Sequence, residues 1–143
     1  MNIGLVYFKE ENNNFVFLLG KRSLDSDLYS DLGGYLEEDN FDLVKTIFND
    51  NTFNLIDLSD DNINYNFQND KYKYKLYFLE NNVSDSVIET VNKVRNNINK
   101  SKDFDLRWFK LDEILDNKQL FEKEFFNTFI KSVKKYKDNF IKV

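Results

Sequence analysis

Short apolar runs separated by polar breaks mark the strands that the sequence predicts. Two of these runs flank the polar segment 10–14, a spacing that predicts a β-hairpin. Two later segments alternate apolar and polar residues and are rich in aromatics, which is typical of strands with one buried face. The predicted strands are 3–8, 15–19, 62–67, 72–79 and 104–109. Residues 23–31, which are rich in Asp and Ser, predict a polar loop.

Helical spacing begins at Phe41, from which apolar residues recur every three or four positions. Asn40 or Asp39 is placed to cap this helix, and Ser84 or Asp85 to cap a later one. The predicted helices are 41–51, 84–98, the short 111–115 and 119–136, the last with Phe125, Phe126, Phe129, Ile130 and Val133 facing inward. No repeat, linker or change of composition divides the chain. The order of elements predicts one α+β domain over residues 1–143.

The composition excludes several kinds of protein. The 143 residues are 41% hydrophobic, enough for one core, and no apolar run is long enough for a transmembrane helix. The chain has neither Cys nor His, which excludes disulfides, Cys/His zinc sites, thiol nucleophiles and Ser-His-Asp triads. Acid–base chemistry would fall to Asp, Glu, Lys or Tyr, and a metal would be a hard cation bound by oxygen. With no secretory signal visible, we expect a cytoplasmic protein without a membrane partner.

The net charge of −5 argues against a general nucleic-acid coat, since proteins that bind nucleic acid through their overall charge are usually basic. The chain has no Ala or Pro and only four Gly, while Asn is abundant. The scarce residue types are those with GC-rich codons, so an AT-rich genome explains the bias. The abundance of Asn is therefore no sign of function.

Gly33 and Gly34 are the only adjacent glycines in the chain. A glycine pair permits positive φ angles and close backbone approach, so we expect a special conformation here. The pair lies in the segment SDLGGYLE (30–37), after a strand ending FLLGKR (17–22) and before a helix; the segment LRWFKLDEI (106–114) follows later. This order resembles the Nudix family over roughly residues 3–115. The resemblance implies a Nudix-like α/β/α sandwich, with a mixed β-sheet between the helices 41–51 and 119–136.

The signature of the family, Gly-x5-Glu-x7-Arg-Glu-U-x-Glu-Glu-x-Gly-U with U a bulky aliphatic residue, gathers glutamates on one helix face to bind Mg²⁺. Counted from Gly34 without a gap, the three glutamate positions of this helix fall on residues 49, 52 and 53. They fall on 47, 50 and 51 after a two-residue deletion, and on 46, 49 and 50 after one further shift. Every register leaves at most one acid, Asp50. The Gly-x5-Glu position becomes Asn40, or Asp39 if one residue is deleted.

The resemblance implies a function built on a nucleoside diphosphate linked to another group, which members of the family typically hydrolyse with Mg²⁺. Because the metal-binding acids are largely missing, we expect a degenerate member that binds its ligand, with hydrolysis absent or strongly reduced. The ligand would be a nucleotide, a nucleotide derivative or a capped RNA end. The residues expected to hold it are Lys21, Arg22, Gly33, Gly34 and Trp108. No cofactor is then expected.

Two alternatives stay open. One is an active Mg-dependent hydrolase, with Asp50 in catalysis and a metal site rebuilt from Asp50, Glu37, Glu38 and Glu80. The other is a non-catalytic protein-interaction domain that uses an outer surface. The basic helix face 131–137, with Lys131, Lys134, Lys135 and Lys137, is a candidate surface for RNA or a protein partner. A solvated helix face explains the same lysines without any ligand.

Overall fold

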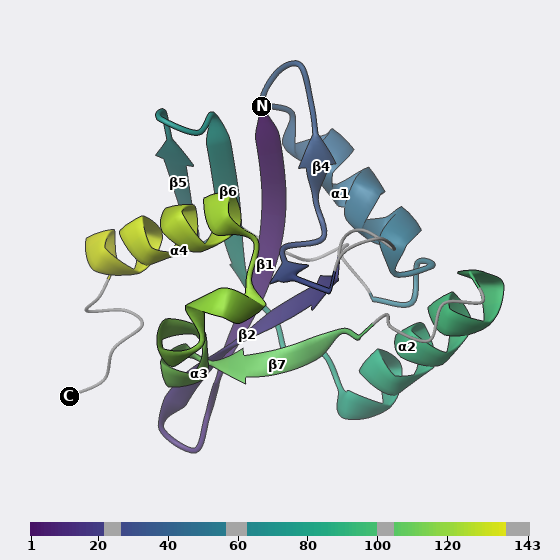
Figure 1. Cartoon of the computed structure of the whole chain (residues 1–143). Coiled ribbons are helices and arrows are strands. Elements are labelled where there is room, and N and C mark those ends of the chain that lie inside the picture. Colours follow the sequence, from purple (N-terminus) through teal and green to yellow (C-terminus); the bar gives the residue numbers. More distant parts are fainter. Residues whose placement is uncertain (22–26, 57–62, 100–104, 137–143) are drawn as a thin grey trace.

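A seven-stranded mixed sheet forms the centre of the protein, whose computed structural model describes residues 1–21, 27–56, 63–99 and 105–136 (Figure 1). The strand order is β3-β2-β1-β6-β5, with β4 paired to β1 and β7 paired to β2. β1 runs parallel to β6 and antiparallel to β2. The strands are β1 (Asn2–Glu11), β2 (Asn14–Lys21), β3 (Tyr29–Ser30), β4 (Gly34–Tyr35), β5 (Tyr65–Asn69), β6 (Tyr74–Glu80) and β7 (Arg107–Lys110).

A two-residue turn joins β1 to β2 and confirms the predicted hairpin, which is longer than its apolar runs. Asn12 and Asn13 form the turn, with φ angles of 52° and 66°. Tight hairpin turns need this left-handed backbone, and asparagine tolerates it better than most residues. Some of the asparagines therefore have a structural role, since they take the left-handed backbone conformation of a turn.

Helices cover both faces of the sheet, as the α/β/α prediction requires (Figure 1). On one face lie α1 (Phe41–Asn51) and α2 (Asp85–Asn99), and on the other α3 (Leu111–Asp116) and α4 (Lys123–Lys135). The side chain of Asn40 caps α1 by accepting a hydrogen bond from the Leu43 N–H at 3.2 Å. The Ser84 hydroxyl accepts the Val87 N–H at the start of α2. In the described part of the chain no helix is long and apolar enough to cross a membrane.

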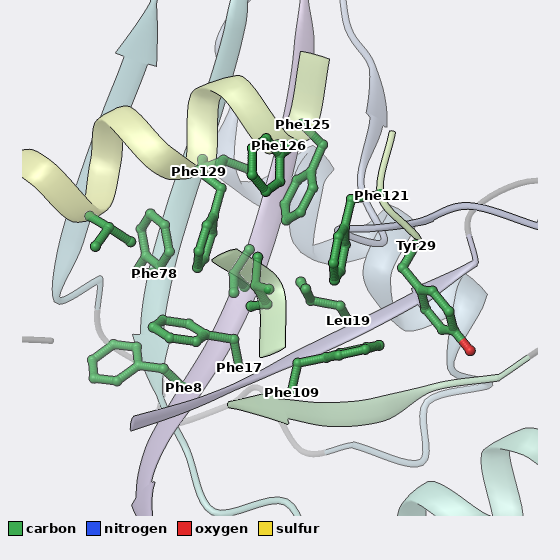
Figure 2. Close-up of a cluster of buried hydrophobic side chains, with 14 of the residues drawn as sticks. Phe8, Phe17, Leu19, Tyr29, Phe78, Phe109, Phe121, Phe125, Phe126 and Phe129 are labelled. Carbon is green, nitrogen blue, oxygen red and sulfur yellow. The ribbon is translucent and has the colours of Figure 1, made fainter. Parts of the chain in front are cut away.

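The two faces of the sheet bury different side chains. The core under α1 and α2 is mainly aliphatic, whereas the core under α4 is packed with phenylalanines, which Figure 2 shows gathered between the sheet and the helix. Phe17 of β2 meets Phe129 of α4 edge to face, with ring centroids 5.0 Å apart. Such aromatic pairs stabilise a core beyond the area that they bury.

Several predicted boundaries differ from the structure. Tyr29 and Ser30 are a buried strand paired with the end of β2, so the polar-loop prediction is wrong there, while 22–26 lie outside the described residues. The last helix begins at Lys123 and not at 119, because a separate 3₁₀ turn, Lys118–Leu120, precedes it. A turn with positive φ at Lys73 delays the start of β6, and β5 also begins later than predicted. Residues 62 and 104 lie outside the described chain.

Candidate functional site

The two glycines differ in what their backbone needs. Neither has a positive φ angle, so the expected left-handed conformation is wrong. The predicted close approach of the backbone is confirmed at Gly33, where an added Cβ would lie 1.9 Å from the Ile3 carbonyl oxygen and 2.6 Å from the Gly4 Cα. At Gly34 the nearest atom to an added Cβ is a methyl carbon of Ile47 at 3.5 Å, an ordinary contact. Gly33 is therefore fixed by packing against β1, and Gly34 is not.

A buried carboxylate holds the chain just before the glycine pair. Asp31 is fully buried and accepts hydrogen bonds from the Gly33 N–H at 2.8 Å and from the Tyr74 hydroxyl. An added Cβ at Gly4 would lie 2.0 Å from the carboxyl carbon of Asp31, so Gly4 makes the room that this side chain occupies. A buried carboxylate is tolerated only with such partners. Asp31 therefore shapes the glycine loop from inside the fold.

Asp39, the acid closest to the Gly-x5-Glu position, is engaged by two side chains of β6. Its carboxylate accepts the Lys75 ammonium at 2.5 Å and the Tyr77 hydroxyl at 2.5 Å. Burial raises the pKa of Asp39, but these two hydrogen bonds outweigh it and bring the pKa below its usual value. The pKa of Lys75 is lowered by burial and raised more strongly by Asp39 and Tyr77, so it lies above its usual value. Asp39 thus ties the loop before α1 to the sheet.

Replacing Asp39 by Asn is expected to lower the free energy of unfolding by about 1 kcal/mol at neutral pH, the scale of a partly exposed pair. The lowered pKa gives a contribution that is present above the unfolded value, about 3.9, and is lost as the pH falls through the folded pKa. Urea unfolding at pH 7 and in acid measures this difference. Glu38→Gln, an exposed neighbour, is the control and should change stability little. An Asp39→Asn effect that is the same in acid would rule out the ion pair as its cause.

The four acids proposed for a rebuilt metal site are not brought together. Glu37 and Glu38 line one surface hollow, and Glu80 lines another beside Lys9. Asp50 is exposed near the end of α1 and lines neither hollow. Within the described ranges, no three acidic side chains are grouped so that they could hold a metal ion. These residues do not fit the three-carboxylate magnesium site that the family signature implies.

Asn51, a glutamate position in one register, has a structural role at the end of α1. Its side-chain amide donates to the Leu32 carbonyl at 2.9 Å, just before Gly33. Arg95 of α2 is buried and reaches both the backbone carbonyl and the side-chain oxygen of Asn51 at 3.4 Å. Burial lowers the pKa of Arg95. An amide, which both donates and accepts, suits this position, whereas a carboxylate could not donate to Leu32.

Lys21 lies in a cluster of cations around the ring of Tyr29. The Lys21 ammonium is 5.5 Å from the ring centroid, and the guanidinium of Arg107 on β7 is 5.2 Å from it. Arg107 also lies 4.3 Å from the ring centroid of Phe109. Figure 2 shows the Tyr29 hydroxyl directed away from the phenylalanine cluster, at the edge of the core. The sequence indicated Lys21 but not Arg107, because nothing local predicts that β7 pairs with β2. Arg22 lies outside the described residues.

Two carboxylates accompany these cations. Asp105 accepts the Tyr29 hydroxyl at 2.5 Å and lies 3.4 Å from the Arg107 Nε, while Asp27 is 4.0 Å from the Lys21 ammonium. Burial, and then the hydrogen bond and charge of Asp105, raise the pKa of Tyr29 to about 12. The phenol therefore stays neutral at physiological pH. Tyr29 belongs to the core under α4, and Lys21 contacts its ring, so Lys21 lies on the α4 face of the sheet. α1 and Asp50 lie on the opposite face.

Trp108 packs on the core under α1 and α2. Its indole Nε1 is buried without a hydrogen-bond partner in the described part of the chain, and the Lys9 ammonium lies 4.5 Å from the ring centroid. Its role in binding a base stays a prediction.

The basic face 131–137 is exposed where the structure describes it. Lys131, Lys134 and Lys135 are exposed, and the Lys135 ammonium lies over the rings of Phe67 and Tyr136. Lys137 lies outside the described residues.

Of the comparisons with known proteins, only the one with solved structures gives a match. No protein-family model matches the chain, and no curated protein matches its sequence. Among solved structures the chain is similar to a MutT/Nudix family protein from Listeria innocua, with a TM-score of 0.52 and 13% sequence identity. The match covers 98% of this chain and 94% of that chain. The chain therefore has a Nudix-like fold. A similarity at this level of sequence identity shows the fold alone.

Proposed function

We propose that this chain uses its Nudix-like fold to bind a nucleoside-diphosphate-type ligand, with hydrolysis absent or strongly reduced. One observation carries the proposal: two cations gather on the ring of Tyr29, while the acids that would hold a metal lie apart. The ligand would be a nucleotide, a nucleotide derivative or a capped RNA end.

The cation cluster suits a diphosphate. Arg107 presents a planar fork of donors that matches phosphate oxygens, and Lys21 supplies a second positive charge beside it. The Arg107 side chain is half exposed, so a ligand can reach it. Asp27 is almost fully exposed and only 4.0 Å from Lys21, a loose pair that a phosphate can replace. The negative charge of Asp105 would repel an anionic ligand, so we expect weak rather than tight binding.

The loss of hydrolysis follows from the separation of the acids. A bound magnesium ion would neutralise the diphosphate and activate water, effects that would supply several kcal/mol of transition-state stabilisation. Asp39 is held by Lys75, and Glu80 lies in a different hollow from Glu37 and Glu38. Because the described residues bring no such set of carboxylates together, we expect bound ligand to remain intact.

Arg107→Ala is expected to weaken ligand binding by about 1.5–3 kcal/mol, the scale of a charge-assisted hydrogen bond. Calorimetric titration with ADP, ADP-ribose and a cap dinucleotide, each with and without Mg²⁺, measures the affinity. Lys110→Ala is the matched control, since it removes one positive charge from the same strand. Arg107→Lys keeps the charge and loses the fork, so it should fall between the two.

The melting temperature of each variant is measured alongside, because Arg107 also packs on Phe109. Binding by none of the three ligands would contradict the proposal. Equal affinities for Arg107→Ala and Lys110→Ala, with both variants folded, would also contradict the assigned site.

A further inference from the structure

Among the described residues, the short strand β4 has one unpaired backbone edge, which lies beside α1. Leu36 and Met1 exchange hydrogen bonds in both directions, at 2.8 and 2.6 Å, and the next pair in the register is Tyr35 with Asn2. Antiparallel strands alternate bonded and non-bonded pairs, so the N–H and C=O of Tyr35 point away from β1. The Asn2 N–H accordingly donates to Lys73 on its other side. In the described part of the chain, β4 pairs with β1 and with no third strand.

A hollow with both apolar and acidic walls lies next to this edge. Its volume is about 790 Å³, and its walls are Tyr35, Leu36, Glu37, Glu38 and Leu43. Tyr35 is 72% exposed, more than any other large hydrophobic side chain among the described residues, and Leu43 is 47% exposed. A single exposed leucine needs no explanation. An exposed tyrosine whose backbone has no partner on one side among the described residues presents both parts of a strand-addition site.

The charge of the hollow selects its ligand. Glu37 and Glu38 are both exposed, and no lysine or arginine of the described residues lines the hollow. The whole chain carries a net charge of −5. A phosphate would be repelled here, whereas lysine or arginine side chains would be attracted. This hollow is therefore separate in chemistry from the cation cluster at Tyr29.

We propose that the β4 edge binds an extended, basic segment of a partner protein. The segment adds one strand to β4 through the backbone of Tyr35. Its alternate apolar side chains enter the hollow against Tyr35 and Leu43, and its lysines or arginines face Glu37 and Glu38. Tyr35 is the anchor, because exposed aromatic side chains that become buried carry much of the affinity in small interfaces.

The test uses a short fluorescein-labelled peptide of alternating lysine and valine, with a glutamate–valine peptide as the charge control. Saturable binding of the basic peptide alone is expected by fluorescence anisotropy. Tyr35→Ala should weaken it by at least about tenfold, while Tyr35→Phe keeps the ring and the affinity. Leu115→Ala removes a similarly exposed leucine on α3 and should leave binding unchanged.

Two further readouts separate strand addition from general attraction to an acidic protein. The Tyr35 amide should exchange with solvent freely in the free protein and become protected when the peptide binds. Glu37→Gln/Glu38→Gln should weaken binding more than Asp112→Asn/Asp116→Asn, which removes the same charge from α3.

Four results would overturn the proposal: no saturable binding, equal binding of the acidic peptide, wild-type affinity for Tyr35→Ala, or an unprotected Tyr35 amide in the complex. Self-association in sedimentation velocity that Tyr35→Ala abolishes would assign the edge to a second copy of the chain instead.

Discussion

Gly33→Ala is expected to lower the free energy of unfolding by at least about 3 kcal/mol, since the new Cβ would meet backbone that cannot yield cheaply. The contacts are 1.9 Å to the Ile3 carbonyl oxygen and 2.6 Å to the Gly4 Cα. Moving β1 to relieve them would disturb its pairing with β4 and β6. Urea unfolding followed by circular dichroism measures the loss.

The matched control is Gly34→Ala. The sequence assigns both glycines the same importance, but the Cβ at Gly34 would meet only a side chain at 3.5 Å. Its expected cost is below about 1 kcal/mol, because neither a clash nor a positive φ is involved. Equal costs for the two substitutions would contradict the packing account of the glycine pair.

Phe129→Ala is expected to cost about 3–5 kcal/mol, the range for removing a fully buried phenylalanine. Phe129 of α4 is fully buried and contacts the rings of Phe17, Phe78 and Phe125. These rings come from β2, β6 and α4, so the cavity would open between the helix and the sheet. Denaturant unfolding should show a lower midpoint with the slope unchanged.

Lys131→Ala, two residues further along α4, is the control for Phe129→Ala. Its side chain is exposed, and the expected change is within about 0.5 kcal/mol. A Phe129→Ala cost close to that of the control would contradict the view that the aromatic core fixes α4 to the sheet.

The periodic parts of the fold could be predicted from the sequence. The helix 41–51 has the predicted bounds, and its Asn40 cap is confirmed. The alternation in β5 and the inward face of α4 are also confirmed, because each depends only on neighbours within a few residues. The prediction of one buried face is wrong for β6, where Leu76, Tyr77, Phe78 and Leu79 are all buried, because this central strand packs against a core on each face of the sheet. The Nudix-like sandwich was implied by a resemblance carried by the glycine pair and its flanking segments in their order along the chain, and the structural similarity supports it.

The parts that were missed depend on contacts between distant residues. Asp31 is in a polar segment, and only the fold places it beneath Gly4 and Tyr74. The Asp39–Lys75 pair spans 36 residues, and the Arg107 contact with Tyr29 spans two strands that do not follow each other in sequence. Among the described residues, no glycine takes a positive φ angle, whereas three asparagines do, Asn12, Asn13 and Asn54, together with Phe53 and Lys73. A composition poor in glycine shifts that role to asparagine.

Turnover of nucleoside diphosphate derivatives is the measurement that tests the central claim most directly. The purified chain is incubated with ADP-ribose, a nucleotide sugar and a cap dinucleotide in Mg²⁺ or Mn²⁺, and product formation is followed. The account predicts binding without hydrolysis at ordinary enzyme rates, and no change in the residual rate for Asp50→Ala. Turnover at about 1 s⁻¹ or faster that Asp50→Ala abolishes would contradict it, and would show that a working metal site has been rebuilt around that residue.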